Sequence, residues 1–209
     1  MTRLLLVRHG KTEWNETGRY QGCSDTCLSS TGREEAEAAR QRLAAEKIDV
    51  IYCSDLERAV QTAKTIASGR DVKLVTCKEL REIDFGEFEG LTFDEVSRRY
   101  PDNDWWTARD AAQKLPQGES VGQLAARVDQ FTATCLRKHT DEETILIVAH
   151  GGSLRTLICR LLGLGLEHWW QIGIDSASLT IMETYPLGMT LSVLNDTCHL
   201  KHLRKDSPW

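Results

Sequence analysis

Several common sequence features are missing from this chain. No apolar run approaches the ~20 residues that a membrane-spanning helix needs. The start, MTRLLLVRHG, has only four consecutive apolar residues before Arg8, which is too few for the core of a signal peptide. The sequence also contains no Walker loop and no zinc-ligand motif. We therefore expect a cytoplasmic protein without a membrane span, and neither a P-loop nor a structural zinc site is indicated.

An excess of positive charge is also absent, because the formal net charge is −5. This argues against a general binder of nucleic acids or anionic membranes, but it leaves room for a local basic pocket. The seven cysteines are scattered and include no C-x-x-C pair, so we expect reduced thiols, several of them buried. The segment Cys198–His202, CHLKH, is interpreted as structural, since isolated Cys and His residues rarely complete a four-ligand metal site.

Strand and helix signals alternate along the 209 residues, a length that suits one large domain, residues 1–209. This alternation predicts an α/β sandwich with a mostly parallel sheet. The expected strands are runs of branched apolar residues. They are Leu4–Val7, Asp49–Cys53, Val72–Thr76, Thr144–Ala149, Ser178–Thr184 and Thr190–Leu194.

Helix starts are predicted from capping boxes, in which a Ser or Thr precedes a Glu or Gln by three residues. The predicted caps are Thr31, Ser54, Thr92 and Ser120. A further helix is expected from Gly151–Gly152 to Leu162.

The irregular stretch Pro101–Gly118, with Trp105 and Trp106, predicts a lid-like segment over about residues 92–120.

Two histidines follow predicted strands in the same way. His9 comes directly after LLLVR, and His150 follows TILIVA, and each is followed by glycine. A single histidine at a strand end is more often structural, but a matched pair favours function. Because ligands bind beyond the carboxyl ends of strands in open α/β sheets, we expect both rings at one edge of the sheet.

Two further residue types stand near these strand ends. Arg58 falls in the first turn of a predicted helix, where a positive charge opposes the helix dipole unless an anion binds there. The segment ELREIDFGEFEG contains several acids, and composition does not choose among them. Arginines that bind phosphate oxygens, a neutral imidazole as nucleophile and a carboxylic acid as proton donor together suit phosphoryl transfer.

The order of these motifs resembles that of the histidine phosphatase superfamily, in the branch shared with cofactor-dependent phosphoglycerate mutases. The resemblance rests on LLLVRHGKTEWN, GRYQG, LSSTGREEA, IYCSDLERAVQTA, LREIDFGEFEG, PQGES and VAHGGSLRTLI, which extend over nearly the whole chain. It implies a three-layer α/β sandwich, with a mostly parallel six-stranded sheet and helices on both faces. It also implies that catalysis requires no metal and no cofactor.

The resemblance also implies roles for individual residues. His9 matches the histidine that becomes phosphorylated, and Glu82 matches the proton donor. Arg8, Arg58 and His150 match the groups that hold the phosphate. The implied substrate contacts further include Asn15, Gln21, Gly22 and Gly151.

The identity of the substrate is less constrained than the reaction. A mutase is disfavoured because the chain has no E-R-x-Y-G segment after Glu82, and the pair Arg98–Arg99 is expected on a solvated helix face. Within the phosphatases, the chain is most similar to the α-ribazole phosphatases of cobalamin biosynthesis, where Trp105 or Trp106 would stack on the base.

Phosphoserine phosphatase is the main alternative, and its substrate would need a charged clamp, for which Arg109 or Lys114 with Asp175 are candidates. A broad-specificity phosphatase and a non-catalytic phosphate-binding module are further alternatives. The expected partner is a small phosphomonoester, with no nucleic acid and no membrane. A homodimer is left open.

Overall fold

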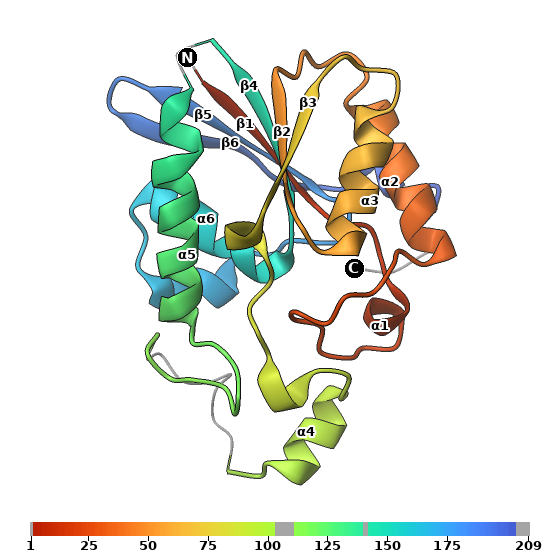
Figure 1. The fold of residues 1–209 in the computed structure, drawn as a ribbon, viewed down its shortest axis with the longest axis vertical. Helices are drawn as coiled ribbons and strands as arrows, with labels where there is room; N and C mark the ends of the chain where they lie inside the picture. The colour runs from red at the N-terminus through yellow and green to blue at the C-terminus, as the bar shows by residue number, and fades with distance from the viewer. Residues whose placement is uncertain (1, 103–110, 140–141, 204–209) are drawn as a thin grey trace.

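A six-stranded sheet forms the centre of the computed structural model, which describes residues 2–102, 111–139 and 142–203. The strand order is β3-β2-β4-β1-β5-β6; β3, β2, β4 and β1 are parallel, and β5 and β6 are antiparallel additions. This confirms the predicted strands and the mostly parallel sheet (Figure 1). The strands are β1 Arg3–Arg8, β2 Val50–Ser54, β3 Lys73–Cys77, β4 Thr144–Ala149, β5 Leu179–Tyr185 and β6 Gly188–Asp196.

The α-helices lie between the strands in chain order, as the alternating pattern predicts. Short 3₁₀ turns join several of them: η1 Lys78–Leu80, η2 Gly86–Phe88, η3 Leu136–Lys138, η4 Leu166–Gln171 and η5 Cys198–Leu200. The α-helices are α1 Glu13–Glu16, α2 Ser30–Arg42, α3 Glu57–Ala67, α4 Phe93–Arg99, α5 Val121–Thr134 and α6 Gly151–Leu162.

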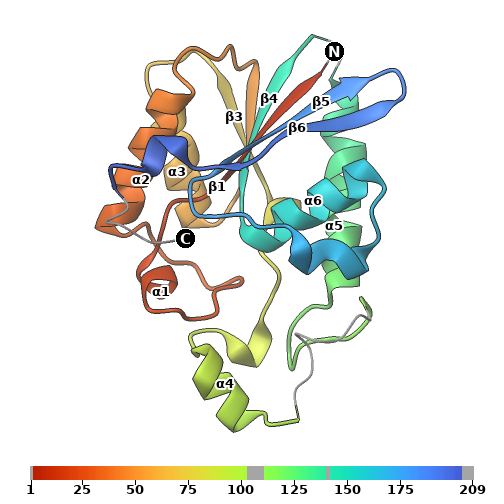
Figure 2. The same cartoon turned by 180° about the vertical axis from the view of Figure 1, so that it is seen from behind.

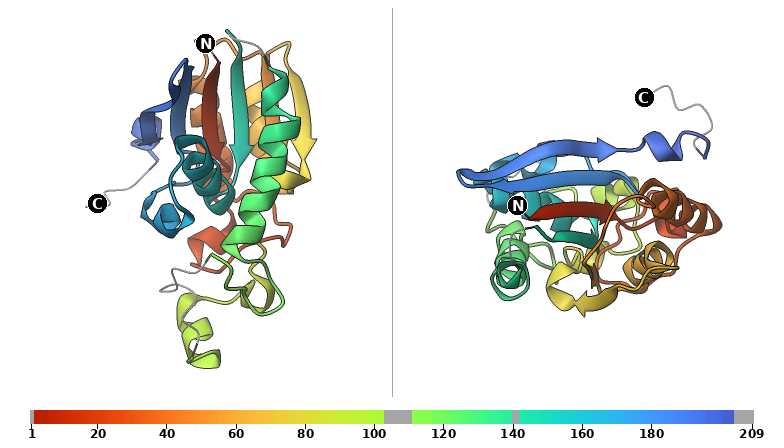
Figure 3. Two further views of the ribbon diagram at one scale, coloured as in Figure 1. Left: turned by 90° about the vertical axis from the view of Figure 1, so that its left-hand side faces the viewer. Right: turned by 90° about the horizontal axis from the view of Figure 1, so that it is seen from above.

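The sheet is covered on both faces, which gives the expected three layers. Helices α5 and α6 cover one face, and α2 and α3 cover the other (Figure 3, right). Alternate residues of β1 enter opposite cores, since Leu4 and Leu6 contact the α5–α6 side whereas Leu5 and Val7 contact the α2–α3 side. A strand buried on both faces explains the continuous apolar run in the sequence.

Two of the predicted helix caps are wrong. Helix α2 begins at Ser30 and its N-cap is Ser29, two residues before the predicted cap Thr31, because the hydroxyl of Ser29 accepts the backbone N–H of Gly32. Helix α3 has Leu56 as its N-cap, and Ser54 still belongs to β2. The boxes at Thr92 and Ser120 are confirmed, with reciprocal side-chain bonds.

The carboxyl ends of the parallel strands all point toward one end of the molecule. Helices α1 and α4 lie at that end, and the N-terminus lies at the opposite end (Figure 2). Arg98 and Arg99 are exposed on α4, which confirms the solvated face expected there. No helix among the described residues is long and apolar enough to cross a membrane.

Candidate active site

The two matched histidines meet at one edge of the sheet. Strands β1 and β4 are parallel neighbours in which Arg8 pairs with Ala149, so the next residues, His9 and His150, emerge side by side. The backbone N–H of His9 donates to the carbonyl oxygen of Ala149 at 2.9 Å. The ring centroids lie 4.9 Å apart and both side chains are buried. The predicted meeting of the histidines is confirmed.

The two rings are held in opposite tautomers. The Nδ1 atom of His9 lies 2.7 Å from the carbonyl oxygen of Gly10; because that oxygen can only accept, Nδ1 carries the proton and Nε2 keeps its lone pair. In His150, Nδ1 accepts from the Nε–H of Arg58 at 3.2 Å, so the proton of the neutral ring lies on Nε2. One ring therefore offers a nucleophile and the other a hydrogen-bond donor.

Both histidines are uncharged at neutral pH. Burial lowers the pKa of His9 well below its usual 6.5, and the charges of Arg58 and Arg8 lower it further. Burial and the Arg58 charge likewise lower the pKa of His150. A neutral imidazole is the form in which a histidine can act as a nucleophile.

Arg58 is fully buried at the start of α3, and its guanidinium is hydrogen-bonded to other groups of the protein. Besides His150, its NH1 donates to the carbonyl of Ser24 at 2.8 Å and its NH2 to the carbonyl of Gly22 at 2.6 Å. Burial lowers its pKa to about 10. The positive charge in the first turn of the helix is thus accommodated by carbonyl groups and an imidazole, and it acts electrostatically on both histidines.

At the site, two buried donors have no hydrogen-bond partner among the described residues. They are Nε of Arg8 and Nε2 of His150. The NH1 of Arg8 is held by the carbonyl of Ile174 at 2.7 Å, which fixes the guanidinium beside the histidines. Buried donors are costly when unpaired, so this pair of groups marks a place for an anion.

Glu82 is the acid that reaches the site. Its Oε2 accepts the backbone N–H of Gly152 at 2.9 Å, and its Oε1 accepts that of Ile83 at 2.9 Å. A Cβ atom at Gly152 would lie 2.2 Å from Glu82 Oε1, so the glycine permits this approach. Three other acids of the segment bond elsewhere: Asp84 to Gly86 N–H, Glu87 to the Tyr100 hydroxyl, and Glu89 to the N–H groups of Cys23 and Ser24.

The segment that carries Glu82 is fastened by Arg127 of α5. Its NH1 donates to the carbonyls of Glu79 and Arg81 at 2.9 and 3.2 Å, and its NH2 to that of Glu82 at 3.1 Å. Glu119 pairs with Arg127 in a bidentate ion pair at 2.8 and 2.7 Å, and it also accepts the N–H of Asp84. Sequence reasoning did not find this clamp.

A cleft of about 240 Å³ opens above these groups. It is lined by the predicted residues Arg8, Asn15, Gln21, Glu82 and Gly151. His9, Arg58 and His150 are buried and are not among the lining residues, and Gly22 contributes its carbonyl to Arg58. Asn15 and Gln21 are both held by Thr12, whose N–H donates to Asn15 Oδ1 at 3.1 Å and whose hydroxyl donates to Gln21 Oε1 at 2.8 Å.

Other lining residues were missed from the sequence. Arg155 follows Gly151 by four residues, and this helical spacing is a signal that would have placed it on the same face. Trp169 comes from η4 and has no sequence signal; its indole N–H lies 3.1 Å from the carbonyl of Gly152 and 2.9 Å from the hydroxyl of Thr156. The remaining missed residues are Arg19, Tyr20, Ile83, Phe85 and Gly152.

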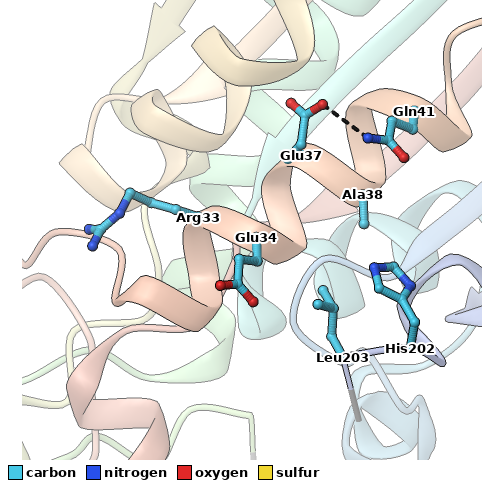
Figure 4. A pocket seen from close by; sticks show the side chains of 7 residues that line it. All are labelled: Arg33, Glu34, Glu37, Ala38, Gln41, His202 and Leu203. Carbon is cyan, nitrogen blue, oxygen red and sulfur yellow. Dashed lines mark hydrogen bonds between the residues drawn. The ribbon is translucent and has the colours of Figure 1, made fainter.

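A second groove, of about 370 Å³, lies between α2 and the C-terminal segment (Figure 4). None of the predicted site residues lines it. Across the described residues, no group of three or more His, Cys, Asp or Glu side chains is placed to hold a metal ion. The residues that line this second groove are Arg33, Glu34, Glu37, Ala38, Gln41, His202 and Leu203.

Comparison with known proteins places this site in a family. Residues 4–197 match the model of the histidine phosphatase superfamily, branch 1. The chain belongs to this superfamily. Since its members hydrolyse phosphomonoesters, the prediction of a phosphoric monoester hydrolase is confirmed.

Individual relatives cover almost the whole chain. Phosphoserine phosphatase 1 of Hydrogenobacter thermophilus is 35% identical over 96% of this chain and 95% of its own length. The adenosylcobalamin/α-ribazole phosphatase of Escherichia coli is 32% identical over 92% of this chain and 95% of its own. The solved structure of Bacillus stearothermophilus YhfR superposes with a TM-score of 0.87, at 33% identity, over 96% of this chain and 100% of its own.

Proposed function

We propose that this histidine phosphatase hydrolyses phosphomonoesters through a covalent phosphohistidine at His9. The proposal is carried by one observation: a ring nitrogen with a free lone pair lies in the same cluster as two hydrogen-bond donors that have no partner among the described residues. His9 Nε2 keeps its lone pair, and the unpartnered donors of Arg8 and His150 belong to the same buried cluster. A nucleophile beside donors for an anion is what in-line attack on phosphorus needs.

The reaction has two steps. In the first, His9 Nε2 forms a bond to phosphorus while the ester P–O bond breaks, and Glu82 gives its proton to the departing alkoxide. Arg8 and His150 donate to the equatorial oxygens, and the charge of Arg58 adds to the field. In the second, the Glu82 carboxylate takes a proton from water, the water oxygen bonds to phosphorus, and the N–P bond breaks to restore neutral His9.

Charge stabilisation has to supply most of the acceleration. Rate enhancements for phosphate monoester hydrolysis reach ~10²¹, or about 28 kcal/mol. Positioning of reactants accounts for roughly 7–11 kcal/mol of such a total. The remainder falls to preorganised donors and charges, and Arg8, Arg58 and the N–H groups at the start of α6 are the groups placed to provide it.

Two compounds are candidates for the specific substrate. α-Ribazole 5′-phosphate remains a prediction, supported by the resemblance and by the E. coli relative. The stacking residues expected for it, Trp105 and Trp106, lie outside the described residues, as does Arg109. Phosphoserine is supported by the H. thermophilus relative and by the small cleft, since ~300–1,000 Å³ is usual for drug-sized ligands.

The charged clamp expected for phosphoserine needs revision. Lys114 is exposed and does not line the cleft. Asp175 lies close enough to Arg8 and Arg155 to influence the pKa of both guanidinium groups. Arg155 lines the cleft together with Arg8 and Arg19, lies close to Glu82, and was not among the candidates. A cytoplasmic location, the lid over residues 92–120 and a homodimer stay predictions.

The test is a panel of steady-state rates. We expect turnover of p-nitrophenyl phosphate, α-ribazole 5′-phosphate and phosphoserine to be unchanged by EDTA and inhibited by vanadate, and 3-phosphoglycerate not to be isomerised when 2,3-bisphosphoglycerate is added. Loss of activity with chelator would contradict metal-free catalysis. Efficient mutase activity would reverse the choice of hydrolase over mutase, and no turnover at all would favour a binding module.

A further inference from the structure

Arg155 occupies the wall of the cleft and is fixed there by neutral groups. Its Nε donates to the carbonyl of Ile172 at 2.7 Å, and its guanidinium carbon lies 5.3 Å from the centroid of the Trp169 ring. Trp169 is itself held by its indole N–H to Gly152 and Thr156. The guanidinium is therefore anchored at one edge and over one face, and it stays at the cleft.

Its charge has no direct partner within the described part of the chain. Arg155 forms no ion pair with a described carboxylate, although Glu82 and Asp175 lie close enough to raise its pKa. Its Nε is hydrogen-bonded to Ile172, whereas NH1 and NH2 have no hydrogen-bond partner among the described residues. Arg19, also on the cleft, differs, because its NH1 lies 3.2 Å from Glu95 Oε2. Burial lowers the pKa of Arg155, which records the cost of desolvating it. A partly buried guanidinium with open donors is stabilised by a bound anion.

The position of Arg155 assigns that anion to the leaving alcohol. Glu82 lies close enough to raise the pKa of Arg155, and it contacts the same helix through Gly152 N–H. Glu82 is the proposed donor to the leaving oxygen, so it faces the alcohol side of the reacting phosphorus. A group bound beside Glu82 on this wall belongs to the alcohol, whereas the transferred phosphoryl group lies against Arg8 and the histidines.

We propose that Arg155 binds a carboxylate of the leaving alcohol, and that the substrate is a small phosphomonoester with a carboxylate a few bonds from the ester oxygen. Phosphoserine and 3-phosphoglycerate belong to this class, whereas α-ribazole 5′-phosphate carries no such group. With Nε occupied by Ile172, NH1 and NH2 present one parallel pair of N–H donors, which matches the two oxygens of a carboxylate. This inference rests on the proposed function.

The test compares phosphoserine with phosphoethanolamine, which lacks only the carboxylate. We expect the unmodified enzyme to prefer phosphoserine by about 10- to 100-fold in kcat/KM, the range for a hydrogen-bonded charged pair. Arg155→Gln should remove this preference by lowering the rate for phosphoserine, and Arg155→Lys should restore part of it. Arg160→Gln is the matched control, because Arg160 lies on the same helix, exposed and paired with Asp129 at 2.7 Å.

Two results would overturn the inference. One is no preference for phosphoserine in the unmodified enzyme, and the other is an unchanged preference in a folded Arg155→Gln variant, whether or not both rates fall equally. Thermal melting checks that the variant is folded, and the unmodified enzyme tests the preference without any variant. If no phosphomonoester were hydrolysed, the proposed function would fail separately; calorimetric affinities for the same two compounds would then decide the Arg155 contact.

Discussion

Two parts of the site use their polar groups differently. We call the buried group of Arg8, His9, Arg58 and His150 the floor, and the cleft-lining pair Arg155 and Trp169 the wall. On the floor, hydrogen bonds fix both imidazole tautomers and the open donors belong to one buried cluster with the His9 lone pair. On the wall, Arg155 lies close enough to Glu82 for the carboxylate to raise its pKa, and its NH1 and NH2 have no hydrogen-bond partner among the described residues. In the proposed mechanism the floor binds the phosphoryl group of any substrate, and the wall distinguishes one leaving alcohol from another.

Glu82 stands between the two regions, and its substitution gives the largest expected effect. Glu82→Gln should slow formation of the phosphoenzyme from alkyl phosphates by about 10²- to 10⁴-fold, the usual contribution of a general acid. The effect on p-nitrophenyl phosphate should be much smaller, since nitrophenolate leaves without a proton. Single-turnover quenched-flow measurements isolate this first step from water activation in the second. Equal slowing of both substrates would assign the proton to another acid, with Asp84 next.

A substitution in the floor should lower the rate by the same factor for every leaving alcohol. His150→Ala removes one donor to the equatorial oxygens and should lower kcat by roughly 10²- to 10³-fold, the range for loss of one oxyanion-hole donor. The loss should be the same for phosphoserine, phosphoethanolamine and p-nitrophenyl phosphate. His168→Ala, an exposed histidine on η4, is the control and should leave rates unchanged. A loss that depended on the alcohol would remove the distinction between floor and wall.

Arg127 should act on catalysis only through Glu82. Arg127→Met frees the backbone carbonyls of Glu79, Arg81 and Glu82, and a displacement of about 1 Å at Glu82 costs up to ~10²-fold. The loss should follow the Glu82→Gln pattern, larger for alkyl phosphates than for p-nitrophenyl phosphate, and Arg127→Lys should recover part of it. A variant that melts earlier yet shows no such dependence on the leaving group would make the clamp purely structural.

The pH dependence of stability tests the neutral state of the floor. The unfolded chain binds protons at His9 and His150 near pH 6.5, whereas the folded chain, with both pKa values lowered, does not. Stability should therefore be complete above about pH 7 and fall below 6.5, by about 1.4 kcal/mol per pH unit for each histidine. Urea midpoints at pH 7.0 and 5.5 measure this, and His9→Gln should reduce the slope. Identical midpoints would contradict the lowered pKa values.

The sequence predicted the floor well because its parts follow local signals. Apolar runs located all the strands, and two parallel strands that each end in His-Gly bring His9 and His150 to one edge. The caps at Thr31 and Ser54 failed because a competing hydroxyl, that of Ser29, begins α2 earlier, and because β2 extends through Ser54. Where a capping pattern overlaps another signal, only the tertiary structure shows which residue caps the helix.

The wall was missed for two reasons: the helical spacing that places Arg155 on the face of Gly151 was not used, and Trp169 depends on distant segments packing together. Trp169 reaches the cleft from η4 because Gly152 leaves room and offers a carbonyl, and neither fact is visible in the sequence around Trp169. The choice of Glu82 among neighbouring acids likewise came from the family resemblance rather than composition. Only the structure shows its bond to Gly152 N–H and its place in the cleft.

The central claim is that His9 carries the phosphoryl group, and trapping the intermediate tests it most directly. Enzyme mixed with substrate, quenched in base and digested should yield a peptide containing His9 with one added phosphate, stable in base and lost in acid. His9→Ala should yield no phosphopeptide and should lower turnover on the order of 10⁵- to 10⁶-fold, as removal of a hydrolase nucleophile does. Phosphate on a serine, or undiminished turnover by His9→Ala, would contradict the account.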